Sequence, residues 1–264
     1  MAEEVVKQNF KENLKAIEYH EELHGILRTL HIYFEITASF IYDVLKSRRF
    51  EGKKLLEVGS GATVHSIASA SAYFPIIVQS DFVEDNLENL KLWHKGQSPL
   101  DWSAFLDIVA SLEDFKSDVQ EVRAKLESRI RKSVKAIVHC DFLKDGVLKL
   151  EEVPAEASPP YDLIIAVQCL EVPCGDLESF VNVLKRLKKL LRKGGGLILS
   201  SFHDCEEWEV RKKKFPHLKI SLKEIVAALD KAGFGNHDVK RFSPLVTDYN
   251  LTYGGYYCIA TEAL

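Results

Sequence analysis

The chain has 264 residues, of which 46% are hydrophobic and 28% are charged, and its net charge at pH 7 is −4. This length suits one globular domain with a sizeable core, and the composition excludes a disordered chain. The slightly acidic balance lacks the basic footprint of nucleic-acid binding, so we expect no nucleic-acid partner. No apolar run approaches the ~20 residues that span a bilayer, and no signal-peptide pattern opens the chain. We therefore expect a cytoplasmic monomer without a membrane partner.

The first fifty residues have the periodicity of amphipathic helices. Leu14, Ile17, Leu23 and Ile26 recur at near-helical spacing, and an apolar stretch rich in aromatic residues follows. No glycine-rich turn that could hold a ligand occurs before residue 50. We predict that residues 1–50 form a helical cap or lid over the rest of the chain. The same pattern also suits helices that only pack against the core.

Residues 51–264 alternate between strand-like and helix-like segments. This alternation predicts βαβ units and a parallel sheet with helices on both faces, within a single domain. A charged helical insertion at about 96–133 interrupts it, and its opposite charges three or four residues apart suit a solvated helix face. The expected strands are Leu55–Val58, Pro75–Asp81, Val134–Cys140, Tyr161–Val167, Leu197–Phe202, Asn236–Phe242 and Tyr256–Thr261, and the other expected helices are about Val64–Ala72, Glu84–His94, Asp176–Leu191 and Ser221–Ala232.

Three further predictions concern a helix end, an irregular segment and a helix start. We expect Gly194–Gly196 to stop the helix before them, and residues 204–214 to be an irregular charged stretch. Ser221 and Glu224 have the spacing of a capping box at the start of a helix.

The cysteines do not suggest a metal site. An odd number without paired CxxC spacing favours reduced thiols in an intracellular protein. Cys169 and Cys174 lie close together, but no second pair accompanies them, so we expect no bound metal. The five cysteines are Cys140, Cys169, Cys174, Cys205 and Cys258.

A glycine turn follows the first strand and forms the centre of the expected ligand site. The sequence Glu57-Val-Gly-Ser-Gly61 lets backbone N–H groups approach a ligand closely. A dinucleotide fingerprint would place a third glycine where this chain has Val64, which disfavours a nicotinamide-dinucleotide oxidoreductase. A turn of this kind can also be purely structural.

Acidic residues follow two further strands. Asp81 stands at the end of the second strand, ~20 residues past the glycines, where a carboxylate can accept both ribose hydroxyls. It could instead cap the next helix. Asp141 repeats the placement after the third strand, where an acid can accept the exocyclic amine of an adenine. Three strand ends that present suitable groups favour a shared ligand over packing alone.

Longer stretches resemble one enzyme family. Residues 80–93, 101–103 and 140–141, and Cys169–Cys174 with the Asp176-Leu pair, are similar to the nicotinamide, phenylethanolamine, indolethylamine and thioether methyltransferases. The similarity is good over about 50–200 and weaker at both ends. It implies a Rossmann-like sheet, mostly parallel with an antiparallel last strand, and S-adenosyl-L-methionine as the cofactor.

The resemblance also implies a set of binding residues. Gly59, Ser60, Gly61 and Thr63 would hold the methionine part of the cofactor. Asp81 and Asn86 would hold the ribose, and the adenine would lie among Phe82, Asp141 and Phe142. Val167 would contact the cofactor from the fourth strand, and Tyr19 would be the lid tyrosine.

The acceptor side departs from the family pattern. The acid that the family often carries after the fifth strand corresponds to Ser201 here, and Asp204 could replace it. Trp208 corresponds to an aromatic residue that stacks on the acceptor, and His217 to a serine that contacts it. Tyr249 and Tyr253 are expected at the mouth of the site.

These features predict an S-adenosylmethionine-dependent enzyme that methylates the nitrogen of a small amine or pyridine-like metabolite by in-line attack. No catalytic acid or base is obligatory if the acceptor nitrogen is already neutral. Two alternatives remain open: a cofactor-binding homologue with little catalysis, and a methyltransferase for a thioether or another small acceptor.

Overall fold

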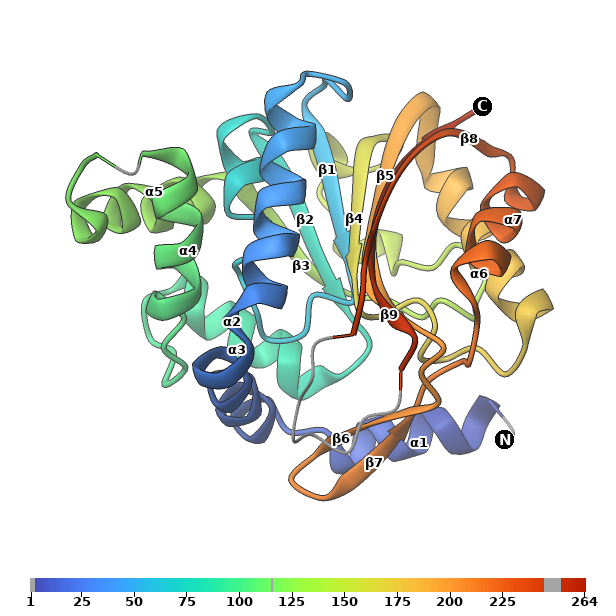
Figure 1. The fold of residues 1–264 in the computed structure, drawn as a ribbon. Helices are drawn as coiled ribbons and strands as arrows, with labels where there is room; N and C mark the ends of the chain where they lie inside the picture. Colours follow the sequence, from blue (N-terminus) through green and yellow to red (C-terminus); the bar gives the residue numbers. More distant parts are fainter. Residues whose placement is uncertain (1–2, 115, 245–252) are drawn as a thin grey trace.

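The computed structural model describes residues 3–114, 116–244 and 253–264. Within them, seven strands form one sheet in the order β3-β2-β1-β4-β5-β9-β8, and β6 and β7 form a separate hairpin (Figure 1). The strands are β1 (Lys54–Val58), β2 (Ile76–Asp81), β3 (Val134–His139), β4 (Tyr161–Val167), β5 (Leu191–His203), β6 (Glu207–Val210), β7 (Lys213–Pro216), β8 (Phe234–Phe242) and β9 (Gly255–Ala263).

The first five strands pair in parallel, and β9 is antiparallel to both of its neighbours, β5 and β8. The predicted fold, with its antiparallel last strand, is therefore confirmed. The α-helices are α1 (Glu3–Asn13), α2 (Ala16–Lys46), α3 (Glu84–His94), α4 (Ser103–Glu113), α5 (Val119–Ser133), α6 (Leu177–Leu190) and α7 (Leu222–Ala232).

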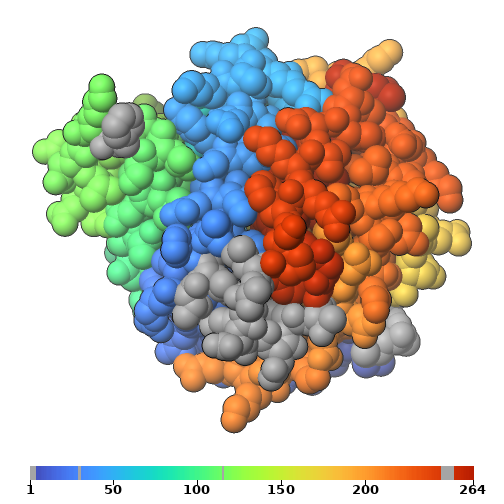
Figure 2. Space-filling view, in the orientation of Figure 1, coloured from blue at the N-terminus to red at the C-terminus, as the bar shows by residue number. Residues whose placement is uncertain are grey.

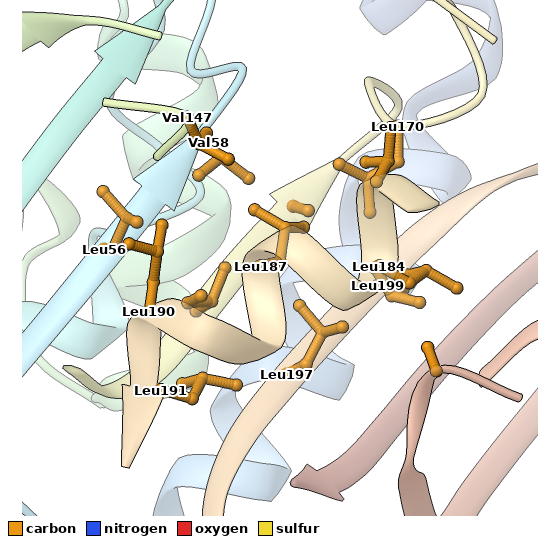
Figure 3. Close-up of a cluster of buried hydrophobic side chains, with 14 of the residues drawn as sticks. Leu56, Val58, Val147, Leu170, Leu184, Leu187, Leu190, Leu191, Leu197 and Leu199 are labelled. Atoms are coloured by element: carbon orange, nitrogen blue, oxygen red, sulfur yellow. The ribbon is translucent and has the colours of Figure 1, made fainter. Parts of the chain in front are cut away.

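Alternating side chains of the sheet supply two separate hydrophobic clusters. On one face, Leu56 of β1 and Leu197 of β5 pack with Leu184 and Leu187 of α6, as Figure 3 shows, and α7 joins the same cluster. Leu55, next to Leu56, belongs to the opposite cluster, which includes residues of α2, α3, α4 and α5. Because successive strand residues point to opposite faces, helices cover both sides of the sheet.

Three local predictions were wrong. Residues 64–72 form only the 3-10 helix η1 (Ser69–Ala72), because Ser71 Oγ and Arg129 both donate to the Ala68 carbonyl and compete with helical bonding. Strand β5 begins at Leu191, so the three glycines lie inside it. Gly196 is needed there because a Cβ would lie 2.4 Å from Phe50 Cγ.

The third error concerns 204–214, where the structure has the hairpin of β6 and β7 in place of an irregular stretch. The abundant charges of this segment lie on its exposed side and hide the alternation. Val210 and Phe215 are buried and pack with Phe10 of α1. The capping box of Ser221 and Glu224 at the start of α7, in contrast, is confirmed.

The N-terminal helices and the hairpin lie near the carboxyl ends of the parallel strands. Figure 1 shows α1 beside the hairpin beyond these strand ends, and α1 contacts β7. Helices α4 and α5 project from one side of the molecule, as Figure 2 shows. None of the helices in the described residues is both long and apolar enough to cross a membrane.

Candidate functional site

A cavity of about 260 Å³ opens at the carboxyl ends of the parallel strands. This is far more than the space of one water molecule, so the cavity can hold an organic ligand. Its wall includes all of the residues predicted to bind the cofactor: Tyr19, Gly59, Ser60, Gly61, Thr63, Asp81, Phe82, Asn86, Asp141, Phe142 and Val167. The structure thus brings together residues from α2, from α3 and from the ends of four strands.

The glycine turn after β1 has the conformation that glycine permits. Gly59 has φ +64° and Gly61 has φ +60°, in the left-handed region that residues with a Cβ rarely adopt. A Cβ on Gly59 would also lie 2.4 Å from the Cβ of Cys169. The Ser60 amide donates to the Ser80 carbonyl at 2.9 Å, which ties the turn to the end of β2.

Asp81 lines the cavity and is not the N-cap of α3, because that position is taken by Val83, which has no side-chain cap. Asp81 Oδ2 accepts from the Gly61 amide at 2.8 Å, and its Oδ1 accepts from the Val83 amide at 2.8 Å and from Asn86 Nδ2 at 3.0 Å. Burial raises the pKa of this carboxyl above its ordinary value. Asp81 therefore fixes the turn relative to the start of α3.

Asp141 is paired with a residue of α1 that the sequence did not indicate. Lys7 Nζ donates to Asp141 Oδ2 at 2.6 Å, with both side chains largely buried. Lys7 and Lys11 also lie over the ring of Phe82, with Nζ 5.9 Å and 5.1 Å from the ring centroid. No local pattern could predict the Lys7–Asp141 pair, because 134 residues separate its members.

Some of the residues predicted to bind the acceptor line the cavity, and others do not. Ser201, Trp208, His217 and Tyr253 line the same cavity. Asp204 is not part of its wall, and its Oδ2 pairs with His203 Nδ1 at 2.8 Å. Tyr249 lies outside the described residues.

Further wall residues were missed by sequence reasoning. Thr37 and Tyr256 form a buried hydrogen-bonded group with Ser200, and Gln168 donates to the Tyr256 hydroxyl at the limit of 3.5 Å. Gln168 follows β4 directly and has φ +52°. Its position after a strand was a usable signal, whereas Thr37 is one of many polar residues in a long helix.

The sequence profile of the NNMT/PNMT/TEMT family matches residues 7–257. The chain belongs to this family. It is similar to nicotinamide N-methyltransferase of Homo sapiens, with 29% identity over 70% of this chain and 67% of the relative. It is 29% identical to the pig (Sus scrofa) enzyme of the same name over 88% of this chain and 81% of that one. Phenylethanolamine N-methyltransferase of Sus scrofa is 29% identical over 72% of this chain and 65% of the relative.

Solved structures support the fold. Magnesium protoporphyrin IX methyltransferase from Synechocystis, determined with bound S-adenosylmethionine, aligns with a TM-score of 0.57 and 13% identity over 99% of this chain and 97% of that chain. An S-adenosylmethionine-dependent methyltransferase from Leishmania major aligns with a TM-score of 0.59 and 12% identity over 98% of this chain and 82% of that chain. The chain is thus a methyltransferase of this family, and its cofactor is S-adenosyl-L-methionine.

One buried atom tests whether the cavity suits this cofactor. Asn86 Oδ1 is buried and has no hydrogen-bond partner among the described residues, although Asn86 lines the cavity. A buried polar atom without a partner is costly, and a ribose hydroxyl could donate to it. With the glycine turn and Asp81 on the same wall, the donor and acceptor groups suit S-adenosylmethionine.

Glu57, which precedes the glycine turn, is a buried carboxyl with a strongly raised pKa. Burial raises its pKa to about 7, although Gln79 Nε2 donates to it at 2.8 Å. A carboxyl whose pKa is higher in the folded state contributes stability below its unfolded pKa, and this contribution is lost as the pH rises to about 7. Glu57 therefore makes the cofactor-free protein less stable in mild alkali.

We expect Glu57→Gln to stabilise the cofactor-free protein at pH 8 by about 1–3 kcal/mol, with little effect below pH 4.5. The amide removes the cost of burying a charge and can still accept from Gln79. Urea unfolding at several pH values measures the difference. The exposed Glu156→Gln is the matched control and should show no such dependence. A Glu57→Gln curve parallel to that of the wild type would contradict the argument.

Proposed function

We propose that this chain transfers a methyl group from S-adenosylmethionine to the nitrogen of a small amine or pyridine-like acceptor. One observation carries the proposal: Tyr19 touches both halves of the cavity. Its ring lies 5.9 Å from that of Trp208, and its Cε1 would be 3.4 Å from a Cβ on Gly61. The glycine turn and the predicted acceptor wall therefore lie within reach of one side chain, which suits direct transfer between two adjacent ligands.

The residues around Tyr19 make an apolar chamber. Trp208 stacks on Phe215 with ring centroids 4.8 Å apart, and Phe10 of α1 packs against both rings. Aromatic faces attract cations, so this wall suits both a sulfonium donor and the cationic product of nitrogen methylation. Burial and the nearby Asp81 raise the pKa of Tyr19, so its phenol remains neutral.

S-adenosylmethionine, when bound, supplies a methyl group on a positively charged sulfur. The glycine turn and Thr63 would hold its methionine part, Asp81 and Asn86 its ribose, and Phe82, Asp141 and Phe142 its adenine. These residues position the donor while the aromatic wall excludes water and orients the acceptor, and such positioning supplies most of the rate effect in a transfer of this kind.

The thiols of the cavity wall do not compete as nucleophiles. Burial raises the pKa of Cys140 to about 12 and that of Cys205 to about 11, and it raises the pKa of Cys169 well above its ordinary value. Because only a thiolate is strongly nucleophilic, these side chains remain protonated near neutral pH. The methyl group is therefore available to the acceptor nitrogen.

Two measurements test the proposal. Calorimetry should show micromolar binding of S-adenosylmethionine, and no binding at millimolar concentration would overturn the cofactor site. A mass-spectrometric screen with isotope-labelled methyl donor against amines, pyridines and thioethers should show products labelled on nitrogen. Products labelled only on sulfur would replace the proposed acceptor, and no product at all would favour a binding protein with little catalysis.

Truncating the aromatic wall gives a third test. We expect Trp208→Ala to raise the KM for the acceptor at least about 10-fold, because a buried aromatic contact contributes more than ~1.4 kcal/mol to binding. Trp208→Phe, which keeps an aromatic face, should change it much less. The Kd for S-adenosylhomocysteine, which has no sulfonium charge, should be the same in both variants and the wild type. Equal acceptor KM values for the wild type and Trp208→Ala would remove Trp208 from the acceptor site.

The cellular setting is also a proposal. The net charge of −4 favours a small-molecule acceptor over a nucleic acid. The five cysteines are unpaired in the structure, as is usual for proteins of the cytoplasm. We propose that the enzyme acts there as a monomer, which light scattering of the purified protein would test.

A further inference from the structure

His217 follows β7, and backbone contacts determine its tautomer. Its Nδ1 lies 3.2 Å from the Cys205 carbonyl and 3.2 Å from the Leu218 carbonyl. Carbonyl oxygens can only accept hydrogen bonds, so Nδ1 must carry the proton. In the neutral imidazole the lone pair is therefore on Nε2.

This lone pair is only weakly engaged. The nearest hydrogen-bond partner of Nε2 is Ser201 Oγ at 3.5 Å, which is long for a hydrogen bond. Both side chains line the cavity, and His217 is 9% exposed. The backbone contacts thus hold an imidazole whose basic nitrogen lies on the side of Ser201, within the acceptor wall that also includes Trp208.

Titratable groups approach His217 from three directions, and each of them has a partner of its own or stays uncharged. Toward β6, Cys205 remains a thiol, and Glu206 forms an exposed ion pair with Lys219 at 2.7 Å. After β4, the Glu171 carboxylate accepts from the Tyr257 hydroxyl of β9, while the Glu171 carbonyl accepts from the Leu218 amide. The hydroxyl of Ser201 faces His217 from β5.

We propose that His217 Nε2 accepts a proton from the acceptor nitrogen, and that the enzyme therefore acts on neutral nitrogen compounds that carry an N–H bond. Arylamines and other weakly basic N–H compounds belong to this class, whereas pyridines do not. This inference rests on the proposed function and narrows its acceptor class. His217 would be a catalytic residue in direct contact with the substrate.

The step balances without a further reactant. The acceptor nitrogen forms the new N–C bond with its lone pair as the S–C bond of the donor breaks, and that pair stays on sulfur. In the same transition state the N–H bond breaks, its pair returns to nitrogen, and the proton bonds to Nε2, so that loss of the base slows the methyl transfer itself. The positive charge of the sulfonium thus ends on the imidazolium, which releases the proton to solvent after the neutral product leaves.

The identity of residue 201 agrees with this acceptor class. A carboxylate at that position would attract a protonated amine, which has no lone pair for attack. A serine hydroxyl holds no charge and can accept from an N–H group. Ser201 therefore gives a protonated amine no carboxylate to pair with, which favours nitrogen compounds that are already neutral.

Aniline and 4-methylpyridine are suitable probes. The two molecules are similar in size and both are neutral at pH 8, but only aniline has N–H bonds. We expect the wild-type enzyme to prefer aniline, and His217→Asn to lower kcat for aniline about 100-fold, the usual scale of general-base catalysis. Turnover of 4-methylpyridine, which has no proton to give, should change less than about threefold.

A second variant and a binding measurement separate a base from a hydrogen-bond acceptor. His217→Gln can offer an amide oxygen to an N–H group but cannot take its proton, so we expect it to bind aniline and turn it over slowly. Calorimetry in the presence of S-adenosylhomocysteine measures this binding without turnover. Cofactor affinity and thermal unfolding of both variants should match the wild type.

Two results would overturn the inference. One is equal loss of aniline and 4-methylpyridine turnover in His217→Asn. The other is an aniline affinity, measured with S-adenosylhomocysteine, that is the same in the wild type and in His217→Ala, which has no side-chain acceptor at this position. In either case labelled nitrogen products could still appear, so the proposed function would stand. If no nitrogen compound is methylated, the proposed function fails, and the affinity comparison still decides whether His217 recognises N–H groups.

Discussion

Asp81→Ala is expected to weaken S-adenosylmethionine binding by about 10- to 100-fold, or 1–3 kcal/mol, the value of charge-assisted hydrogen bonds to a buried carboxylate. The substitution acts twice. It removes the predicted acceptor for the ribose hydroxyls, and it frees the Gly61 amide and Asn86 Nδ2, which donate to Asp81. The turn that should hold the methionine part would then keep only the Ser60–Ser80 backbone hydrogen bond as its tie to the end of β2.

Calorimetric titration with S-adenosylhomocysteine measures this effect without turnover. Asp81→Asn is the informative partner variant, because it keeps one oxygen acceptor but loses the charge, and it should lie between the wild type and Asp81→Ala. Asp145→Ala, which removes a surface carboxylate whose side chain is 89% exposed, should bind like the wild type. An unchanged affinity in Asp81→Ala would mean that the crevice at the end of β2 is not the cofactor site.

Strands β1, β2 and β4 were predictable because they are short, largely apolar runs with sharp boundaries. Leu55 and Leu56 pack on opposite faces, so each had to be apolar whatever its neighbours were. The errors arose where one long-range contact decided the local structure. Arg129 of α5 takes a carbonyl that a helix over 64–72 would need, and Phe50 occupies the space beside Gly196.

The cofactor half of the site was easier to predict than the acceptor half. Parallel strands end at one edge of a sheet, so residues that follow them, such as Asp81 and Asp141, must meet there. The acceptor wall instead depends on how α1 and the hairpin pack together. The contact of Lys7 with Asp141 and the placement of Asp204 outside the cavity follow from that packing, which neither periodicity nor motif spacing encodes.

Gly59→Ala should destabilise the cofactor-free protein by about 2–5 kcal/mol, which combines a left-handed conformation for a residue with a Cβ and the overpacking of a dense site. Gly59 has φ +64°, and its added Cβ would lie 2.4 Å from the Cβ and 2.7 Å from the Sγ of Cys169. Because the turn lines the cavity, the same change should also weaken cofactor binding. Urea unfolding without cofactor measures the stability effect.

Gly61→Ala separates the two causes, because Gly61 has nearly the same φ, +60°, but its added Cβ would approach no atom closer than 3.4 Å. We expect it to cost only the conformational part, about 1–2 kcal/mol. Cys169→Gly removes the atoms that the methyl group added in Gly59→Ala would strike, so it should restore part of the lost stability, and a double-mutant cycle measures that coupling. Equal losses in the two glycine variants, with no coupling to residue 169, would show that backbone strain alone requires Gly59 and that close packing against Cys169 does not.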